Sequence, residues 1–511
     1  MLRSIGDLLR AARRLVAIGC LALPIAAPAA AATLTIAQNF DPQTLWPNSS
    51  TASDNLNAAS AIVQPLFWLD PRSGRAEPLL ATGYQLESPV SVLIRLRPGV
   101  KFTNGEPMDA EAVVHSVAVF TDAKQTPAYA NFAVAIDHAE KVDDTTVRLR
   151  MKFAYPPLQL LLTQIFITPP KYWDAAGRAG FGQKPVGTGP FRLVEWVRDD
   201  RLVMERNPDY WGTPPEGIDR LVFKPVPDET ARVAGLSAGE YDIAKSVPIS
   251  AIAQVQAMAG IDLLAVPSYR IFQLVLYSTE MHPGPLQDQR VRLALNYGID
   301  KQAIINDLFF GQAGALHGQI LRPSQPGYDP SLQDYPYDPA RAKALLAEAG
   351  YPNGFEIGFK FPVGRYAQDQ EVAGAIAGML AKIGVRTHMT SIEPGEFVRQ
   401  MGTGELGPMA FMGFAPSDDP DFQLSLYRSD WRFHIVKNTG LDALIDAGRR
   451  EMDPDKRAAI YRQAMQLMHE DVPIVFLYVD KDFYGVTRRL KGFLPRGDGC
   501  FFFYGTSLDK P

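Results

Sequence analysis

Gly187-Thr188-Gly189-Pro190-Phe191 and, shortly after it, Asn207-Pro208-Asp209-Tyr210-Trp211-Gly212 are the stretches that say most about the fold. Their glycines and prolines shape turns, because glycine adopts backbone angles closed to other residues and proline fixes one of these angles. Tyr210 and Trp211 are expected in a core. Most of these residues are structural, so the two stretches indicate a scaffold rather than a ligand contact.

Strand and helix patterns alternate around these stretches, as in α/β and α+β proteins. Period-two alternation of polar and apolar residues predicts strands at 33–37, 92–97, 146–151 and 202–205. Aspartate caps, prolines at first helical positions and closing glycines predict helices around 113–117 and at 340–349, 371–383 and 454–470. These features stabilise elements and carry no chemistry.

The first 32 residues differ from the rest of the chain. Four arginines within residues 1–14 precede an apolar stretch at 15–28 and then four alanines, the pattern of a secretory signal peptide. The apolar stretch is shorter than the ~20 residues of a membrane span, although an uncleaved anchor is the alternative. Lipoprotein attachment at Cys20 is not expected, because the apolar stretch continues beyond it. We therefore expect residues 1–32 to be removed and the mature protein to be periplasmic.

The composition is that of a soluble globular protein, with 46% hydrophobic and 21% charged residues. A net charge of −5 argues against nucleic acid or an anionic membrane surface as a partner. Once the signal peptide is removed, Cys500 is the single cysteine. Neither an internal disulfide nor a cysteine-rich metal site is then possible.

Motifs of catalysis are missing from the sequence. It contains no G-x-S-x-G, no H-E-x-x-H and no G-x-x-x-x-G-K-[ST]. The histidines are scattered singly, and the acidic pairs at 143–144, 199–200 and 418–419 are typical of solvated turns. No catalytic residue, metal ligand or cofactor is predicted. An exported hydrolase is the alternative from a different functional class.

Further blocks accompany the opening pair in a fixed order. They are Leu96-Arg97-Pro98-Gly99-Val100-Lys101-Phe102 with Asn104-Gly105-Glu106-Pro107, Leu286-Gln287-Asp288-Gln289-Arg290-Val291-Arg292-Leu293-Ala294-Leu295-Asn296-Tyr297-Gly298-Ile299-Asp300, and Tyr337-Asp338-Pro339 with Glu348-Ala349-Gly350-Tyr351. Together these blocks resemble the family 5 solute-binding proteins, the oligopeptide-, dipeptide- and nickel-binding components of bacterial ABC importers. The resemblance spans nearly the whole mature chain.

The resemblance implies a mixed α/β (α+β) fold of two lobes, the class II-like periplasmic-binding-protein fold, with three domains and closure about a hinge. A discontinuous domain I is expected at residues 33–68, 183–275 and 480–511. Domain II, at 69–182, would attach to it and complete the first lobe. Domain III, at 276–479, would form the second lobe, with the ligand enclosed between the two.

Several candidates for solute contact lie in the first lobe or near the expected hinge. Asn39 and Phe40 leave the first strand near the expected cleft, where Asn39 could offer one oriented hydrogen bond or simply form a turn. Trp46 stands where the family commonly has the aspartate of Leu-Asp-Pro, and could stack on a ligand or belong to a core. Tyr269 and Arg270 lie near the hinge crossing, where ligand contact and a structural role are both open.

Candidates in the second lobe begin with Arg365 and Tyr366, just before the predicted 371–383 helix. Arg365 could hold a carboxylate through two parallel hydrogen bonds or form a structural ion pair. Peptide binders of the resembled family often place an acidic residue in a second-lobe loop to pair with the peptide α-amine. The matching stretch here begins at Gly413 and ends at Asp421.

This loop departs from the family's pattern. Asp419 with the following Pro420 fits it, but Phe414 replaces the usual tryptophan. The upstream acidic position is occupied by Ser417 or is missing, depending on a one-residue gap, and Asp418 is a possible substitute. Dipeptide-style amine recognition is therefore in question. Further aromatic candidates are Trp431, Phe433 and Phe483.

A peptide or peptide-like solute is the leading prediction. An opine, a sugar or oligosaccharide, and a metal chelate are the alternatives, and no histidine cluster supports direct nickel coordination. The expected protein partners are the permease subunits of an importer in the inner membrane, and the chain is expected to be a monomer. A periplasmic sensor or chaperone on the same scaffold is a third possibility.

Overall fold

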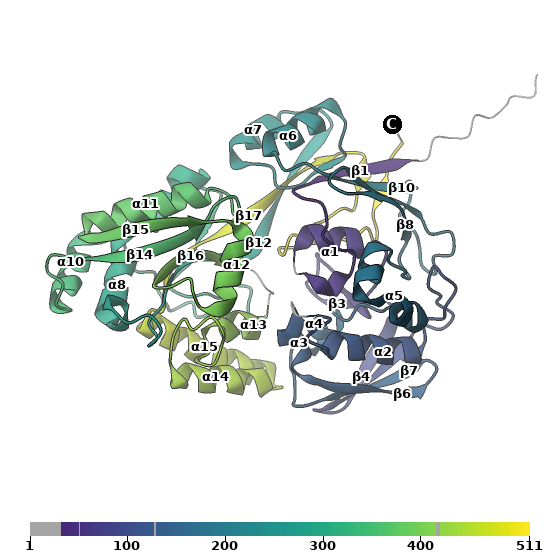
Figure 1. Cartoon of the computed structure of the whole chain (residues 1–511), viewed down its shortest axis with the longest axis horizontal. Coiled ribbons are helices and arrows are strands. Elements are labelled where there is room, and N and C mark those ends of the chain that lie inside the picture. Colours follow the sequence, from purple (N-terminus) through teal and green to yellow (C-terminus); the bar gives the residue numbers. More distant parts are fainter. Residues whose placement is uncertain (1–31, 51, 127–128, 415–418, 511) are drawn as a thin grey trace, which may run out of the picture.

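One mixed sheet of 11 strands runs through the whole molecule in the computed structural model, which describes residues 32–50, 52–126, 129–414 and 419–510 (Figure 1). The predicted signal peptide, apart from Ala32, lies outside the described residues. In sheet order the strands are β15 (Val385–Ile392), β14 (Phe355–Pro362), β16 (Met409–Phe414), β12 (Ile261–Leu276), β17 (Ile474–Thr487), β11 (Ile243–Ala244), β1 (Thr33–Gln38), β10 (Arg220–Pro225), β9 (Arg201–Arg206) and β8 (Phe191–Val197), with β13 (Gly314–Ala315) paired on β17.

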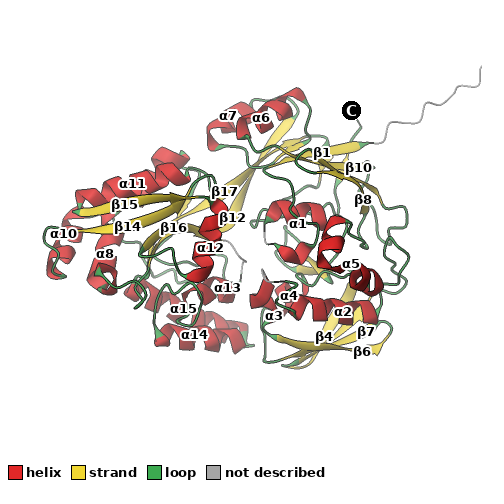
Figure 2. Ribbon diagram, in the orientation of Figure 1, coloured by secondary structure: helices red, strands yellow, loops and turns green. Residues whose placement is uncertain are grey.

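The long antiparallel strands β12 and β17 join the two ends of this sheet. One end of the pair contacts β16 through residues 271–276, and the other contacts β11 through Gly485 and Val486. Figure 2 shows these strands crossing the middle of the molecule. We call the part that carries β14–β16 the second lobe and the part that carries β1 and β8–β11 the first lobe.

Helices cover both faces of the sheet in the second lobe. On one face, α8 (Gln289–Gly298), α10 (Pro339–Glu348) and α11 (Asp369–Lys382) supply one core. On the other, α13 (Pro420–Leu424), α14 (Thr439–Arg450) and α15 (Pro454–Asp471) supply a second core. The remaining elements of this lobe are η4 (Pro285–Gln287), α9 (Lys301–Ala303), the π-helix η5 (Ile304–Leu308), α12 (Pro394–Thr403) and η6 (Ser425–Tyr427).

The sheet of the first lobe is also covered on both faces. Helices α1 (Ser53–Ala59) and α5 (Pro170–Gln183) pack on one face, and α6 (Glu229–Ala238) and α7 (Ile252–Gln256) pack on the other. Figure 1 shows α6 and α7 above the sheet, with α1 and α5 below it. Short elements complete this part: η1 (Pro47–Ser49), η3 (Ile249–Ala251), and the paired strands β18 (Leu490–Lys491) and β19 (Ser507–Leu508).

A separate sheet of four antiparallel strands lies beside α1 and α5, with a hydrophobic core of its own. Its order is β4 (Ala81–Ser88), β5 (Ser91–Leu96), β7 (Thr146–Met151) and β6 (Ile136–Asp143). It is accompanied by α2 (Ala110–Thr121), α3 (Ala130–Ala133), α4 (Leu158–Leu162) and the strand pair β2 (Phe67–Leu69) and β3 (Ala76–Pro78). We call this unit the four-stranded domain.

The segment Gly187-Thr188-Gly189-Pro190-Phe191 joins the four-stranded domain to the first lobe. The Gly189 N–H donates to the Ile62 carbonyl at 2.8 Å, and the Thr103 N–H donates to the Gly187 carbonyl at 3.0 Å. A Cβ at Gly187 would stand 2.0 Å from the Ile62 oxygen, so only glycine fits there. The Thr188 hydroxyl and the Trp211 indole both donate to Gln64 Oε1. The predicted structural role is confirmed, although Tyr210 and Trp211 are both half-buried rather than fully buried.

The local sequence signals gave the element types correctly. Asp109, Asp338 and Asp453 each accept hydrogen bonds from the first turn of the helix they precede. Gly350 and Gly384 follow their helices with φ near +94°, the left-handed backbone region that favours glycine. Within the described part of the chain, no helix combines the length and the apolar character needed to cross a membrane.

Candidate functional site at the hinge

The crossing strands β12 and β17 lose their regular pairing where they pass between the lobes. The register shifts between Pro267 and Ile271, so residues 268–270 stand opposite a single residue of β17, Asp480. A bulge of this kind bends the strand and re-aims its side chains. Polar and charged groups can therefore occupy the centre of a sheet that is otherwise apolar.

The bulge is hydrogen-bonded to segments of both lobes. The Tyr269 N–H donates to the Gly497 carbonyl at 2.7 Å, in the C-terminal segment that packs on the first lobe. From the second lobe, Arg322 Nη1 donates to the Ser268 carbonyl at 3.0 Å, and its guanidinium lies 4.5 Å from the centre of the Tyr269 ring. The angle between the lobes is thus linked to the geometry of these residues.

A cluster of two carboxylates and one guanidinium lies at the bulge. Arg270 Nη1 donates to Asp480 Oδ2 at 2.8 Å and lies 3.8 Å from Asp482 Oδ1. Burial raises the pKa of Asp480 to about 6, against the opposing charge of Arg270. Asp480 is only 8% exposed, and its Oδ1 has no hydrogen-bond partner within the part of the chain that the structure describes. We call Arg270, Asp480 and Asp482 the hinge cluster.

Arg365 lies beyond the end of β14 and is held by its neighbours. Its Nε donates to the Tyr366 hydroxyl at 2.9 Å, and that hydroxyl donates to the Gly413 carbonyl at 2.9 Å. The backbone N–H groups of Arg365 and Tyr366 both donate to Asp369 Oδ2 at the start of α11. Arg365 is exposed, and none of the described carboxylates forms an ion pair with it. The arrangement orients a guanidinium whose terminal nitrogens are open to a ligand.

The hinge cluster and Arg365 share one aromatic environment. The Tyr366 and Phe272 rings meet edge to face, with centres 5.1 Å apart, and the Arg270 guanidinium lies 6.0 Å from the Phe272 ring. A Cβ at Gly413 would stand 3.0 Å from Arg270 Cδ. The structure therefore brings together the predicted residues Arg270, Arg365 and Tyr366 around Phe272, with Tyr269 in the same bulge. The Phe414 ring instead stacks on Phe422, with ring centres 6.2 Å apart.

The acidic loop of the second lobe is described from Asp419 onward. Ser417 and Asp418 lie outside the described residues. Asp419 accepts from both terminal nitrogens of Arg457, at 2.8 and 2.9 Å, and caps α13 through the Asp421 N–H. Both of its oxygens are engaged in structural hydrogen bonds, and the contact of Asp419 with the solute stays a prediction.

The structure favours the core alternative for Trp46 and corrects the predicted ligand contact of Phe483. Trp46 is 1% exposed and packs edge-on against Trp173, with ring centres 4.7 Å apart, in the core of the first lobe. Phe483 is 4% exposed and packs under α6 against Val233 and Leu236. Neither ring has a surface left for stacking on a ligand.

The remaining predicted residues lie in separate places. The Asn39 side chain donates to Ser246 Oγ at 3.2 Å, and its backbone N–H donates to Asp54 at 3.1 Å, so a turn-supporting role accounts for it. Phe40 is 42% exposed beside it. Trp431 is half-buried against Phe433 in the second lobe, with ring centres 5.9 Å apart. No contact among these residues joins them to the hinge cluster.

Asp480 and Asp482 are the site residues that sequence reasoning missed. The signal was present, because Asp-Lys-Asp at 480–482 interrupts two apolar runs of one strand, at 474–479 and 483–486. Charges placed inside a buried strand carry a desolvation cost that calls for an explanation. The pairing that makes them part of a hinge only becomes visible in the fold.

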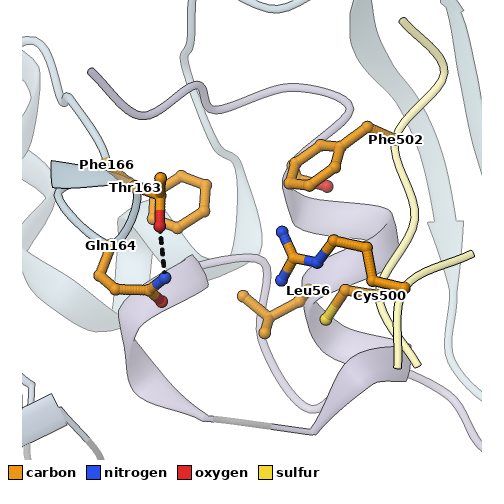
Figure 3. Close-up of a pocket in the computed structure, with 8 residues that line it drawn as sticks. Leu56, Thr163, Gln164, Phe166, Cys500 and Phe502 are labelled. Atoms are coloured by element: carbon orange, nitrogen blue, oxygen red, sulfur yellow. Dashed lines mark hydrogen bonds between the residues drawn. The ribbon is translucent and has the colours of Figure 1, made fainter. Parts of the chain in front are cut away.

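A small cavity lies between α1 and the C-terminal segment (Figure 3). Its volume of about 20 Å³ has room for one water. In Figure 3, Gln164 donates to Thr163 on one side, while Cys500 and Phe502 lie on the other. Burial raises the pKa of the Cys500 thiol, so it stays protonated and is a poor nucleophile. Among the described residues, no group of His, Cys, Asp and Glu is suited to hold a metal ion.

The lobes also meet at a second place, on the four-stranded domain. The Phe132 and Phe422 rings lie 5.0 Å apart, centre to centre, and the Arg450 guanidinium lies 5.9 Å from the Phe153 ring. Burial, followed by the negative charge of Asp421, raises the pKa of Tyr155 in the same region. We call the Phe132–Phe422 contact with its neighbours the distal contact.

Two lobes joined by a pair of crossing strands, with charged and aromatic groups gathered where they cross, are the arrangement of a hinged binding protein. Residues 75–433 match the profile of bacterial extracellular solute-binding proteins, family 5 middle region. The chain belongs to this family, which confirms the predicted resemblance.

Relatives with known names agree with this assignment. Heme-binding protein A of Haemophilus influenzae is 32% identical, with 85% of this chain and 84% of the relative covered. The dipeptide-binding protein of Escherichia coli is 30% identical over 96% of this chain and 97% of its own, and glutathione-binding protein GsiB of Pectobacterium atrosepticum is 28% identical over 98% of both. The solved structure of HbpA2 from Haemophilus parasuis superposes with a TM-score of 0.80 at 27% identity, over 94% of this chain and all of that one.

Proposed function

We propose that this chain captures a peptide or peptide-like solute at the hinge and delivers it to an ABC importer, without a covalent step. The observation that carries this proposal is the oriented guanidinium of Arg365, held by Tyr366 and left without an ion-pair partner among the described residues. Peptides, including glutathione, end in carboxylates, which arginine binds through two parallel hydrogen bonds. The relatives that bind dipeptides and glutathione support the same solute class.

Closure of the lobes follows from where these groups lie. Arg270 and Asp480 belong to the crossing strands, whereas Arg365 belongs to the second lobe. A solute that contacts both sides binds the closed form more tightly and shifts the population toward it. The three predicted domains, at 33–68 with 183–275 and 480–511, at 69–182 and at 276–479, remain part of this proposal. They are supported by the separate hydrophobic cores.

The expected partners are the permease subunits of the importer, and the expected location is the periplasm. Export rests on the basic and apolar pattern of residues 1–32. A monomeric state, no bound cofactor and no enzymatic activity complete the proposal.

A thermal-shift screen tests the solute class. Dipeptides, glutathione, opines and oligosaccharides would each be added in excess, because a bound ligand raises the melting temperature by mass action. We expect the peptides to give the largest shift. A screen in which peptides give no shift and another class does would reject the peptide assignment.

The role of Arg365 is tested by Arg365→Ala, with Arg386→Ala as the matched control. Arg386 is an exposed arginine on β15 that pairs with Glu356 at 3.1 Å. Losing a charge-assisted bidentate contact should weaken binding of a peptide found in the screen by about tenfold or more. The control should bind as the wild type does, and equal dissociation constants for all three proteins would reject the role of Arg365.

A further inference from the structure

The hinge cluster carries one negative charge more than its cation can match. The hydrogen bond of Arg270 goes to Asp480, at 2.8 Å, while the nearest approach of Arg270 to Asp482 is 3.8 Å. No hydrogen bond to the Asp482 carboxylate is made by any side chain in the described ranges, and 21% of this side chain is exposed. A partly buried carboxylate without a full partner is costly, which makes it a candidate binding group.

Two other acidic groups near the hinge each have a cation of their own. Asp54 at the start of α1 pairs with the Lys245 ammonium, and Asp498 in the C-terminal segment receives a hydrogen bond from Arg496 Nε at 3.1 Å. In each of these two pairs the negative and the positive charge cancel. In the hinge cluster, by contrast, the carboxylates of Asp480 and Asp482 share the single cation Arg270.

The hinge cluster also holds a buried acceptor without a partner, because Asp480 is 8% exposed and its Oδ1 has no hydrogen-bond partner among the described residues. Gly499 lies close to the Asp482 carboxylate, and a Cβ placed on Gly499 would stand 3.7 Å from Asp482 Oδ2 and 3.0 Å from Ser53 Oγ. Gly499 has φ near +76°, which also favours glycine. A side chain at this position would therefore crowd Ser53 next to the Asp482 carboxylate.

We propose that Asp482, supported by Asp480, binds the free ammonium group of the solute while Arg365 binds its carboxylate. This inference rests on the proposed function and specifies its ligand as a zwitterion with a free amino group. The Asp482 carboxylate and the Arg365 guanidinium carry opposite charges, as do the two ends of a peptide. An ammonium group has three donors, so it can bond to the carboxylate and to a nearby acceptor together. The subsite lies on the hinge strand β17, and the loop at Asp419, whose carboxylate pairs with Arg457, is not needed for it.

The experiment compares probes with and without a free amino group. The probes are Leu-Leu and glutathione, each in its free and its N-acetylated form, and binding is measured by calorimetry. The wild type should prefer the free forms by about tenfold or more, because a charge-assisted contact of this size is lost on acetylation. In Asp482→Asn that preference should fall toward one, with binding of the acetylated probes unchanged.

A matched control is Asp262→Asn, which makes the same change on the partner strand β12, at an exposed pair with Arg488. The control should keep the wild-type preference. If Asp482→Asn also keeps it, or if the wild type binds acetylated and free probes equally, the ammonium subsite is rejected while the proposed function stands. If neither probe binds the wild type in any form, the peptide assignment and the subsite both fail.

Discussion

Replacing Phe422 by alanine should favour the open form of the protein without touching the hinge cluster. The Phe422 ring packs against Phe132 across the distal contact, 5.0 Å between centres, and against the core of the four-stranded domain. An aromatic pair contributes about 0.5–1.5 kcal/mol beyond its buried area, and a half-buried ring adds to this, so about 1–2 kcal/mol of closed-state stability should be lost. The ratio of closed to open forms should then fall about 5- to 30-fold.

Two measurements together detect this shift. The apparent dissociation constant of a solute scales inversely with the fraction of competent closed protein, so it rises most where the closed form is not already dominant. Where the closed form dominates, X-ray scattering should instead show a larger radius of gyration in the ligand-free protein. Phe355→Ala is the control, since Phe355 packs on Tyr351 within the second lobe. A Phe422→Ala protein with both the wild-type radius and the wild-type affinity would refute the reasoning.

The remaining predictions concern stability, pH and the acidic loop. Gly187→Ala should lower the free energy of unfolding in urea by about 1–3 kcal/mol or more, because its Cβ would meet the Ile62 carbonyl at 2.0 Å, and an unchanged midpoint would contradict this. Peptide affinity should decrease as the pH falls from 7 to 5, because protonation of Asp480, whose pKa is about 6, removes negative charge from the ammonium subsite. An affinity that is flat over this range would count against that role. Asp419→Asn should lower the melting temperature, because it weakens the pair with Arg457, yet change the peptide affinity by less than about threefold, and a large loss of affinity would restore Asp419 as a solute contact.

Local chemistry explains why so much of the fold was predictable. A helix cap needs only an aspartate and the two or three residues after it, so Asp338 and Asp453 mark their helices directly. The need for glycine at position 187 also has a simple cause, because the Ile62 carbonyl comes so close that a Cβ would not fit. Such signals identify elements and close contacts wherever they occur in the chain.

Burial of single aromatic residues could not be predicted in this way. Trp46 lies among Trp173 and Phe181, which are more than a hundred residues away in the sequence. Phe483 faces α6 because of its place in the alternation of β17, which depends on pairing with β12. An aromatic side chain looks the same in the sequence whether it meets a ligand or a core, so only the tertiary packing separates the two.

The hinge cluster depends on the same kind of distant pairing, and this links recognition to motion. Because of the bulge, residues 268–270 stand opposite Asp480 alone, which sets Arg270 next to that carboxylate. The bulge gathers these charges where the strands pass between the lobes. A solute held by Asp482 on a crossing strand and by Arg365 on the second lobe would therefore fix the angle between the lobes through the groups that recognise it.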